Sequence, residues 1–100
     1  RLVVVLGEMR ELGALAAREH DEVGRAAVAA APAVLVAVNG EAARFAAAAA
    51  AAGIPASFHP SGEEAVATVL EAVRPGDVVL VKASRGVRLE AVASALRSAR

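Results

Sequence analysis

The residues best suited to chemistry follow an apolar run late in the chain. Lys82, Ser84 and Arg85 stand close together there, and Gly86 follows them. An arginine can bind a carboxylate or phosphate through two parallel hydrogen bonds, a lysine adds a second positive charge, and a serine adds a hydroxyl. A helix beginning just after this segment would contribute backbone N–H groups and its dipole. The segment therefore predicts a binding site for an anionic group.

A second polar segment follows the first apolar run of the chain. It contains Glu8 and Glu11 and is bracketed by glycines. These carboxylates could orient a substrate amine, or, together with Glu90, form an internal ion-pair network with the cations of the first segment. General acid–base catalysis is the less favoured interpretation because no nucleophile accompanies them.

The two histidines are more typical of structure than of catalysis. His20 falls on the apolar face of a predicted helix, where a histidine is usually hydrogen bonded within the core. His59 ends a short predicted strand. The chain has no His-x-x-x-His spacing and no cysteine, so we expect no metal site in it.

The elements that must position these residues alternate between strand and helix. Short apolar runs rich in β-branched residues predict buried strands at 2–6, 34–38 and 78–81, of which the last is the most apolar. Residues 56–59 predict a further, short strand. Helical spacing and alanine-rich composition predict helices at 15–31, 41–52, 61–73 and 89–99. Ser61 with Glu64 forms a capping box at the start of the third helix, and Gly53 is suited to end the second.

This alternation predicts a single α/β domain over residues 1–100. The fold should be Rossmann-like, with three αβα layers and a mainly parallel sheet of about four strands in the order 3-2-1-4. Ligands of such sheets bind at the carboxyl ends of strands, where the strand order reverses. That point lies between the first and fourth strands, which are the two strands that the polar segments follow.

Composition excludes several classes of partner. Lys and Arg total 11, Asp and Glu total 11, and aromatic residues are 2%, which argues against a nucleic-acid binder. Every apolar stretch is interrupted before about 18 residues, so we expect no membrane insertion. The lack of cysteine fits a reducing compartment. The chain has no P-loop, dinucleotide fingerprint or nucleophile elbow, so we expect no catalytic residue within this domain.

The two polar segments and their surroundings also carry a family resemblance. Residues 6–13, the stretch around His20, residues 75–86 and Glu90 resemble, in order and spacing, the C-terminal domain of the Mur ligases. The most specific parts are Gly-x-Met-x-Glu-Leu-Gly and Lys-x-Ser-Arg-Gly. The similarity is greatest to the members that join D-Ala-D-Ala to UDP-MurNAc-tripeptide.

Three positions depart from the pattern of that family. It commonly has Asp where this chain has Glu8, Gly where it has Ala83, and Met where it has Val87. Glu8 keeps the charge on a longer side chain, and Ala83 restricts the backbone slightly. These departures affect the fine geometry of substrate binding.

The resemblance implies a cytoplasmic three-domain enzyme of peptidoglycan synthesis. ATP with Mg²⁺ would activate the carboxylate of UDP-MurNAc-tripeptide as an acyl phosphate, which the amine of the dipeptide attacks. A central domain would hold most of the ATP and Mg²⁺ site, and an N-terminal domain would hold the UDP-sugar. The present domain would present the dipeptide, close over the nucleotide and be inactive alone. The chain does not begin with Met, and we expect it to be a fragment of such an enzyme.

The resemblance also implies roles for individual residues. Lys82, Ser84 and Arg85 would line the D-Ala-D-Ala pocket, with Arg85 binding the carboxylate of the dipeptide. Glu8 and Glu11 would lie in the facing loop, nearer the domain hinge and the nucleotide.

His20 and Glu90 also match family positions and would brace the two loops.

The main alternative to a ligase is a stand-alone, non-catalytic α/β module that binds an anion. A P-loop upstream of this chain would argue against that alternative. A ligase of the folate-polyglutamate or cyanophycin type is the weaker alternative, because the Lys-x-Ser-Arg-Gly segment argues against it.

Overall fold

The strands and helices predicted from the sequence are all present, with ends that differ from the prediction by no more than two residues. The computed structural model describes residues 1–10, 12–83 and 89–98. The strands are β1 (Leu2–Gly7), β2 (Val34–Val38), β3 (Ala56–His59) and β4 (Val78–Lys82). The helices are α1 (Ala16–Ala29), α2 (Ala43–Ala51), α3 (Gly62–Ala72) and α4 (Glu90–Ser98), and one-turn 3-10 helices η1 (Gly13–Leu15) and η2 (Gly40–Ala42) precede α1 and α2.

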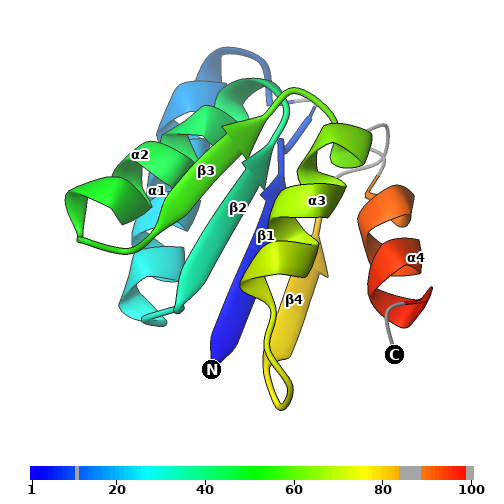
Figure 1. The fold of residues 1–100 in the computed structure, drawn as a ribbon. Coiled ribbons are helices and arrows are strands. Elements are labelled where there is room, and N and C mark those ends of the chain that lie inside the picture. The colour runs from blue at the N-terminus through cyan, green and yellow to red at the C-terminus, as the bar shows by residue number, and fades with distance from the viewer. Residues whose placement is uncertain (11, 84–88, 99–100) are drawn as a thin grey trace.

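The four strands form one parallel sheet in the order β3-β2-β1-β4, as predicted (Figure 1). β1 is therefore central, and its Val5 pairs with Val36 on one side and Val81 on the other. The strand order reverses between β1 and β4, so the carboxyl ends of these two strands mark the expected ligand position.

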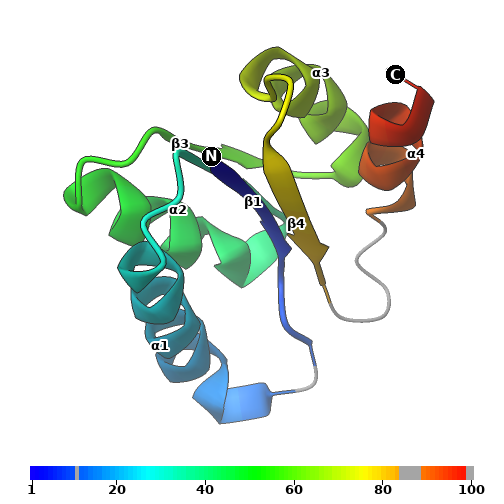
Figure 2. The same cartoon turned by 90° about the horizontal axis from the view of Figure 1, so that it is seen from below.

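Helices cover both faces of the sheet, which gives the three predicted layers (Figure 2). Val5 and Val36 face α3 and α4, where they pack in one core with Val69 and Val92. The intervening residues of the same strands face α1 and α2 and form a second core around Phe45. Burial on both faces explains why β1 and β2 are continuous apolar runs.

Small residues let α1 and α2 pack closely against each other. A Cβ atom added to Gly24 in α1 would lie 3.3 Å from the Cβ of Ala48 in α2, closer than ordinary van der Waals contact, so a side chain there would require α2 to shift slightly. The alanine-rich sequence of α2 thus serves both helix formation and close packing. Within the described ranges, no helix is long and apolar enough to cross a bilayer.

Two helix ends have the geometry expected from the sequence. Ser61 Oγ accepts a hydrogen bond from the N–H of Glu64 at 3.2 Å, at the start of α3. Gly53 follows α2 with a φ of +79°, the left-handed conformation that commonly ends a helix.

One face of β4 differs from the prediction of a fully buried strand. Val79 and Val81 pack against the core under α3 and α4. On the opposite face, Val78 is 66% exposed and Leu80 is 48% exposed. The reason is that β4 is an edge strand: among the described residues, the strand side chains in the core under α1 and α2 come from β1, β2 and β3 and not from β4.

The start of β1 is tied to the turn that precedes β4. Arg1 Nε and Nη2 donate to the two carboxylate oxygens of Asp77 at 3.1 and 2.9 Å, and Nη2 also donates to the carbonyl of Ala72 at 2.8 Å. Asp77 accepts a further hydrogen bond from the N–H of Arg74 at 2.8 Å. The hydrogen bond from Arg1, and then that from Arg74, hold the pKa of Asp77 well below its ordinary value.

Candidate functional site

The candidate site lies at the carboxyl ends of β1 and β4, where the strand order reverses. Lys82 ends β4 directly beside Leu6 of β1, and the loop carrying Glu8 begins two residues later. A groove of about 460 Å³ opens beside this loop, lined by Glu8, Met9, Arg10, Leu12, Gly13, Ala16 and Glu41. The groove lies at the carboxyl ends of β1 and β2, since Glu41 follows β2 and the described lining residues include none of β4. The carboxyl ends of strands are where parallel sheets bind ligands.

A larger groove lies at the opposite end of the strands, near the start of β4. Its volume is about 640 Å³, and it is lined by the ends of α3 and α4 and by the start of β4. Arg74 and Arg97 contribute its positive charge. Because it faces the amino ends of the strands, it is the less favoured ligand position in a parallel sheet.

Glu8 joins the loop after β1 to the start of the next βα unit. Its Oε2 accepts a hydrogen bond from the N–H of Glu41 at 2.6 Å, and its own N–H donates to the carbonyl of Val38 at 3.0 Å. Its Oε1 lies 3.7 Å from Nε of Arg10. Gly40 has a φ of +46°, and a Cβ atom there would overlap the Glu8 carboxylate. A glycine at this position is what allows the carboxylate to reach the N–H of Glu41.

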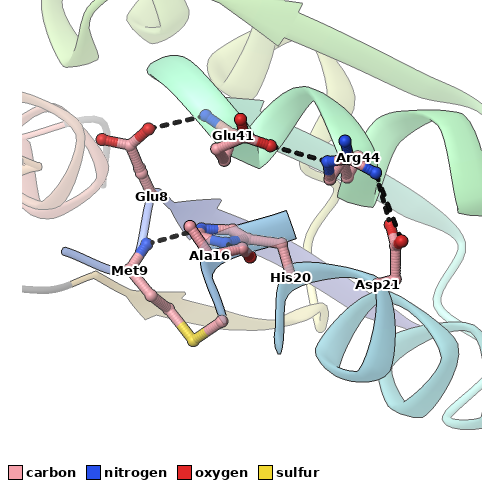
Figure 3. A network of polar contacts seen from close by, with 7 residues as sticks. All are labelled: Glu8, Met9, Ala16, His20, Asp21, Glu41 and Arg44. Atoms are coloured by element: carbon pink, nitrogen blue, oxygen red, sulfur yellow. Dashed lines mark hydrogen bonds and ion pairs between the residues drawn. The ribbon is translucent and has the colours of Figure 1, made fainter. Parts of the chain in front are cut away.

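His20 holds the same loop from the other side (Figure 3). The side chain is fully buried, and its ring centroid is 5.1 Å from that of Phe45. Nδ1 lies 2.6 Å from the carbonyl of Ala16, and Nε2 lies 2.9 Å from the backbone nitrogen of Met9. Because a carbonyl only accepts, Nδ1 must carry the hydrogen, and Nε2 accepts from the Met9 N–H. These contacts define a neutral imidazole in a single tautomer.

Arg44 extends this set of contacts to the surface of α1 and α2. Its Nε donates to Glu41 at 2.6 Å, and Nη1 donates to Asp21 at 3.2 and 3.3 Å. The hydrogen bond to Glu41, and then that to Asp21, raise the pKa of the Arg44 guanidinium. Glu8, Glu41, Arg44 and Asp21 therefore form a chain of polar contacts that joins the β1 loop to both helices.

The structure places two of the residues singled out from the sequence at the β1 loop, and a third beside it. Glu8 and His20 both hold the loop, and Lys82 ends the neighbouring strand with its side chain exposed. Lys82 makes no hydrogen bond or ion pair within the described ranges. Glu8 instead contacts the Glu41 N–H and Arg10. The described contacts therefore contain no ion pair between Glu8 and Lys82, which the sequence offered as one alternative for these residues.

The remaining predicted residues are not brought into this set of contacts. Glu90 is exposed in the first turn of α4. Glu11, Ser84 and Arg85 lie outside the described residues.

Three residues of the site were not found from the sequence: Gly40, Glu41 and Arg44. The available signal is the Asn39–Gly40 pair, which forms the short connection between the predicted strand at 34–38 and the predicted helix at 41–52. In a parallel sheet the carboxyl end of β2 lies beside that of β1, so a turn after β2 necessarily borders a site after β1.

The chemistry that this arrangement supports is binding. No group of three or more histidine or acidic side chains converges within the part of the chain that the structure describes. The Glu8 and Glu41 carboxylates are engaged with a backbone N–H and a guanidinium. The groove therefore offers fixed carboxylates, and the exposed cation Lys82 lies on the neighbouring strand.

Comparison with known proteins identifies relatives along most of the chain. A family model described as "Mur ligase, glutamate ligase domain" matches residues 1–85. The UDP-N-acetylmuramoyl-tripeptide--D-alanyl-D-alanine ligase of Mycobacterium leprae (strain TN) is 43% identical over 98 residues, which is 92% of this chain. The ligase of the same name from Mycobacterium tuberculosis (strain ATCC 25618 / H37Rv) is 40% identical over 112 residues, again 92% of this chain.

A solved structure shows the same fold. The MurF ligase from Thermotoga maritima, crystallised in complex with ADP, superposes with a TM-score of 0.73 over 98% of this chain, at 25% sequence identity. The present chain spans only about a fifth of the length of these proteins: 19% and 21% of the two mycobacterial ligases and 22% of the Thermotoga ligase.

Proposed function

Since the chain belongs to the family of Mur ligase, glutamate ligase domains, we propose that it is the C-terminal domain of a ligase that joins D-Ala-D-Ala to UDP-MurNAc-tripeptide. The observation that carries this proposal is 43% identity, over 92% of the chain, to a ligase named for that reaction. The position of the groove at the carboxyl end of β1 supports it, because small ligands of parallel sheets bind at the carboxyl ends of strands.

In this proposal the domain presents the dipeptide to the reacting centre. The incoming dipeptide carries a carboxylate at one end and an amine at the other. Lys82, together with Ser84 and Arg85, would bind the carboxylate, with Arg85 making the two parallel hydrogen bonds. The exposed position of Lys82 at the end of β4 supports this role. Glu8 and Glu11 would face the hinge and the other domains.

The rest of the reaction belongs to parts of the protein beyond this chain. ATP and Mg²⁺ would activate the tripeptide carboxylate as an acyl phosphate, and would be bound mainly by a central domain. Neither a P-loop in the sequence nor a cluster of metal-binding side chains in the described residues provides for them here. The isolated domain should accordingly be inactive, and the whole enzyme should act in the cytoplasm, where ATP is supplied.

The test uses the full-length ligase and the substitution Arg85→Ala. We expect the KM for D-Ala-D-Ala to rise by about tenfold to a hundredfold, since a charge-assisted hydrogen bond is lost, while the KM for ATP stays within about twofold. Arg97→Ala is the matched control, because Arg97 is exposed in the last turn of α4 at the opposite end of the strands.

Two outcomes would contradict the proposal. If D-Ala-D-Ala does not stimulate ATP hydrolysis by the wild-type ligase, the proposed reaction is wrong. If the reaction occurs but Arg85→Ala and Arg97→Ala have the same KM for the dipeptide, Arg85 does not bind its carboxylate.

A further inference from the structure

We propose that His20 is a positioning residue for the substrate groove, acting through its hydrogen bond to the N–H of Met9. This inference rests on the proposed function, because its kinetic test uses the dipeptide. His20 touches no part of the groove surface itself; the lining residues Glu8 and Met9 are the ones that it holds in place. Its effect on substrate is therefore exerted through the backbone of the loop.

The geometry makes the loop depend on one ring nitrogen. Nδ1 is anchored to the carbonyl of Ala16, one turn earlier in the chain, so the ring cannot rotate without losing that bond. Contact with Phe45 fixes the plane of the ring from α2. Nε2 is thereby directed at the Met9 N–H and accepts its hydrogen bond. The imidazole transmits the position of α1 to the loop after β1.

The loop so held carries the negative wall of the groove. Glu8 precedes Met9 directly, and its carboxylate is also fixed by the Glu41 N–H. Glu41 also lines the groove, and Arg44 binds its carboxylate from outside the groove at 2.6 Å. Carboxylate oxygens at a groove wall can accept hydrogen bonds from an ammonium group, whereas they repel the phosphates of a triphosphate. We therefore assign the groove to the amine end of the incoming dipeptide, and expect His20 to affect dipeptide binding rather than ATP binding.

Two substitutions separate the two hydrogen bonds of the ring. In His20→Gln, the longer side chain can still offer an oxygen to the Met9 N–H. In His20→Asn, the shorter side chain can reach only the Ala16 carbonyl, so the Met9 N–H loses its acceptor. Val69→Ala is the control for stability alone, because Val69 is buried in the core on the opposite face of the sheet.

The experiment measures kinetics and amide hydrogen exchange in the full-length ligase. We expect His20→Asn to raise the KM for D-Ala-D-Ala by about tenfold, with kcat and the KM for ATP within about twofold, and to accelerate exchange at the Met9 amide by at least about tenfold. His20→Gln should stay within about threefold of wild type in both measurements, and Val69→Ala should leave the KM for the dipeptide unchanged.

Three results would overturn the inference. Equal effects of His20→Asn and Val69→Ala on KM would make His20 a structural residue only. Equal effects of His20→Asn and His20→Gln would show that the Met9 hydrogen bond is not the means of action. Unchanged exchange at Met9 in His20→Asn would show that the loop does not depend on the ring. This last measurement needs no substrate, so it tests the inference even if the proposed reaction proves wrong.

Discussion

At the scale of single residues, the site depends on a pair of positions that the sequence separates widely. The Glu8 carboxylate occupies the space that a side chain at residue 40 would need, and it satisfies a backbone N–H at the start of the following helical segment. Gly40 is therefore required twice, once for its positive φ and once for the absence of a Cβ atom. The two residues act as one unit, so their substitutions should not be additive.

Gly40→Ala is expected to destabilise the protein more than Gly53→Ala. Both glycines have positive φ, which costs an alanine about 1 kcal/mol, but only Gly40 has a neighbour in the space of the new Cβ. Displacing Glu8 from the Glu41 N–H should bring the total cost to about 2–3 kcal/mol. Urea unfolding of the two variants measures the difference.

A double substitution provides the control. In a Glu8→Ala background, the further change Gly40→Ala should cost no more than Gly53→Ala does, since no carboxylate remains to be displaced. A Gly40→Ala cost that is the same with and without Glu8 would contradict the proposed coupling.

Residue types and their spacing predicted part of this site. The remaining contacts became known only from the structure, because they join segments that are far apart in the sequence. The apolar spacing around His20 was enough to place its side chain in the core, because helical periodicity determines which face is buried. Its partner Met9 could not be predicted, because the hydrogen bond uses a backbone N–H, which every residue type except proline carries. The same holds for Glu41, whose contribution to Glu8 is its main-chain nitrogen.

At the scale of elements, the end of α1 is strained. The helix ends at Ala29, and Ala31 then adopts a φ of +52°, donating its N–H to the carbonyl of Val28 at 2.9 Å. This left-handed position is usually occupied by glycine. The sequence predicts a helix through Ala31, because alanine favours helix and Pro32 is the first residue that breaks the pattern.

Ala31→Gly is expected to stabilise the protein by about 0.5–1 kcal/mol, because glycine adopts a positive φ without the steric cost that alanine bears. Ala30→Gly is the matched control: Ala30 has a φ of −76°, so the change there should destabilise by a similar amount. Thermal unfolding of both variants reports the sign of each effect. Destabilisation by Ala31→Gly would show that the alanine conformation is not strained.

Element order was highly predictable, and exposure was less so. Continuous apolar runs indicated parallel strands, and right-handed crossovers then left few possible strand orders. The exposed face of β4 escaped prediction because Val78 and Leu80 have the same residue types as the buried strands. Residue type indicates whether a segment can form a strand, whereas the exposure of its side chains depends on which helices pack against it.

At the scale of the whole molecule, the Arg1–Asp77 pair makes stability depend on pH. The folded state lowers the pKa of Asp77, so the folded state binds fewer protons than the unfolded state over the range between the two pKa values. The stabilisation is complete well above about pH 4, the ordinary pKa of an aspartate, and it is lost as the pH falls through the pKa of the folded state.

We expect Asp77→Asn to destabilise the protein at pH 7 and to have a progressively smaller effect below about pH 4. Urea midpoints of wild type and variant, measured from pH 7 to pH 2.5, test this. Asp21→Asn is a useful comparison, because Asp21 also contacts an arginine but is more exposed than Asp77. A difference between wild type and Asp77→Asn that does not change with pH would contradict the assignment.

The central position of β1 has a consequence for how the protein is made. Of these four strands β1 is the first to be synthesised, yet one of its two neighbours is β4, and the Arg1–Asp77 contact joins residues 76 positions apart. During translation, β1 can pair with β2 early, but its other edge stays open until nearly four-fifths of these residues have been synthesised. A nascent chain that pauses before Val78 therefore presents an unpaired apolar edge of β1, the kind of edge that other chains can pair with.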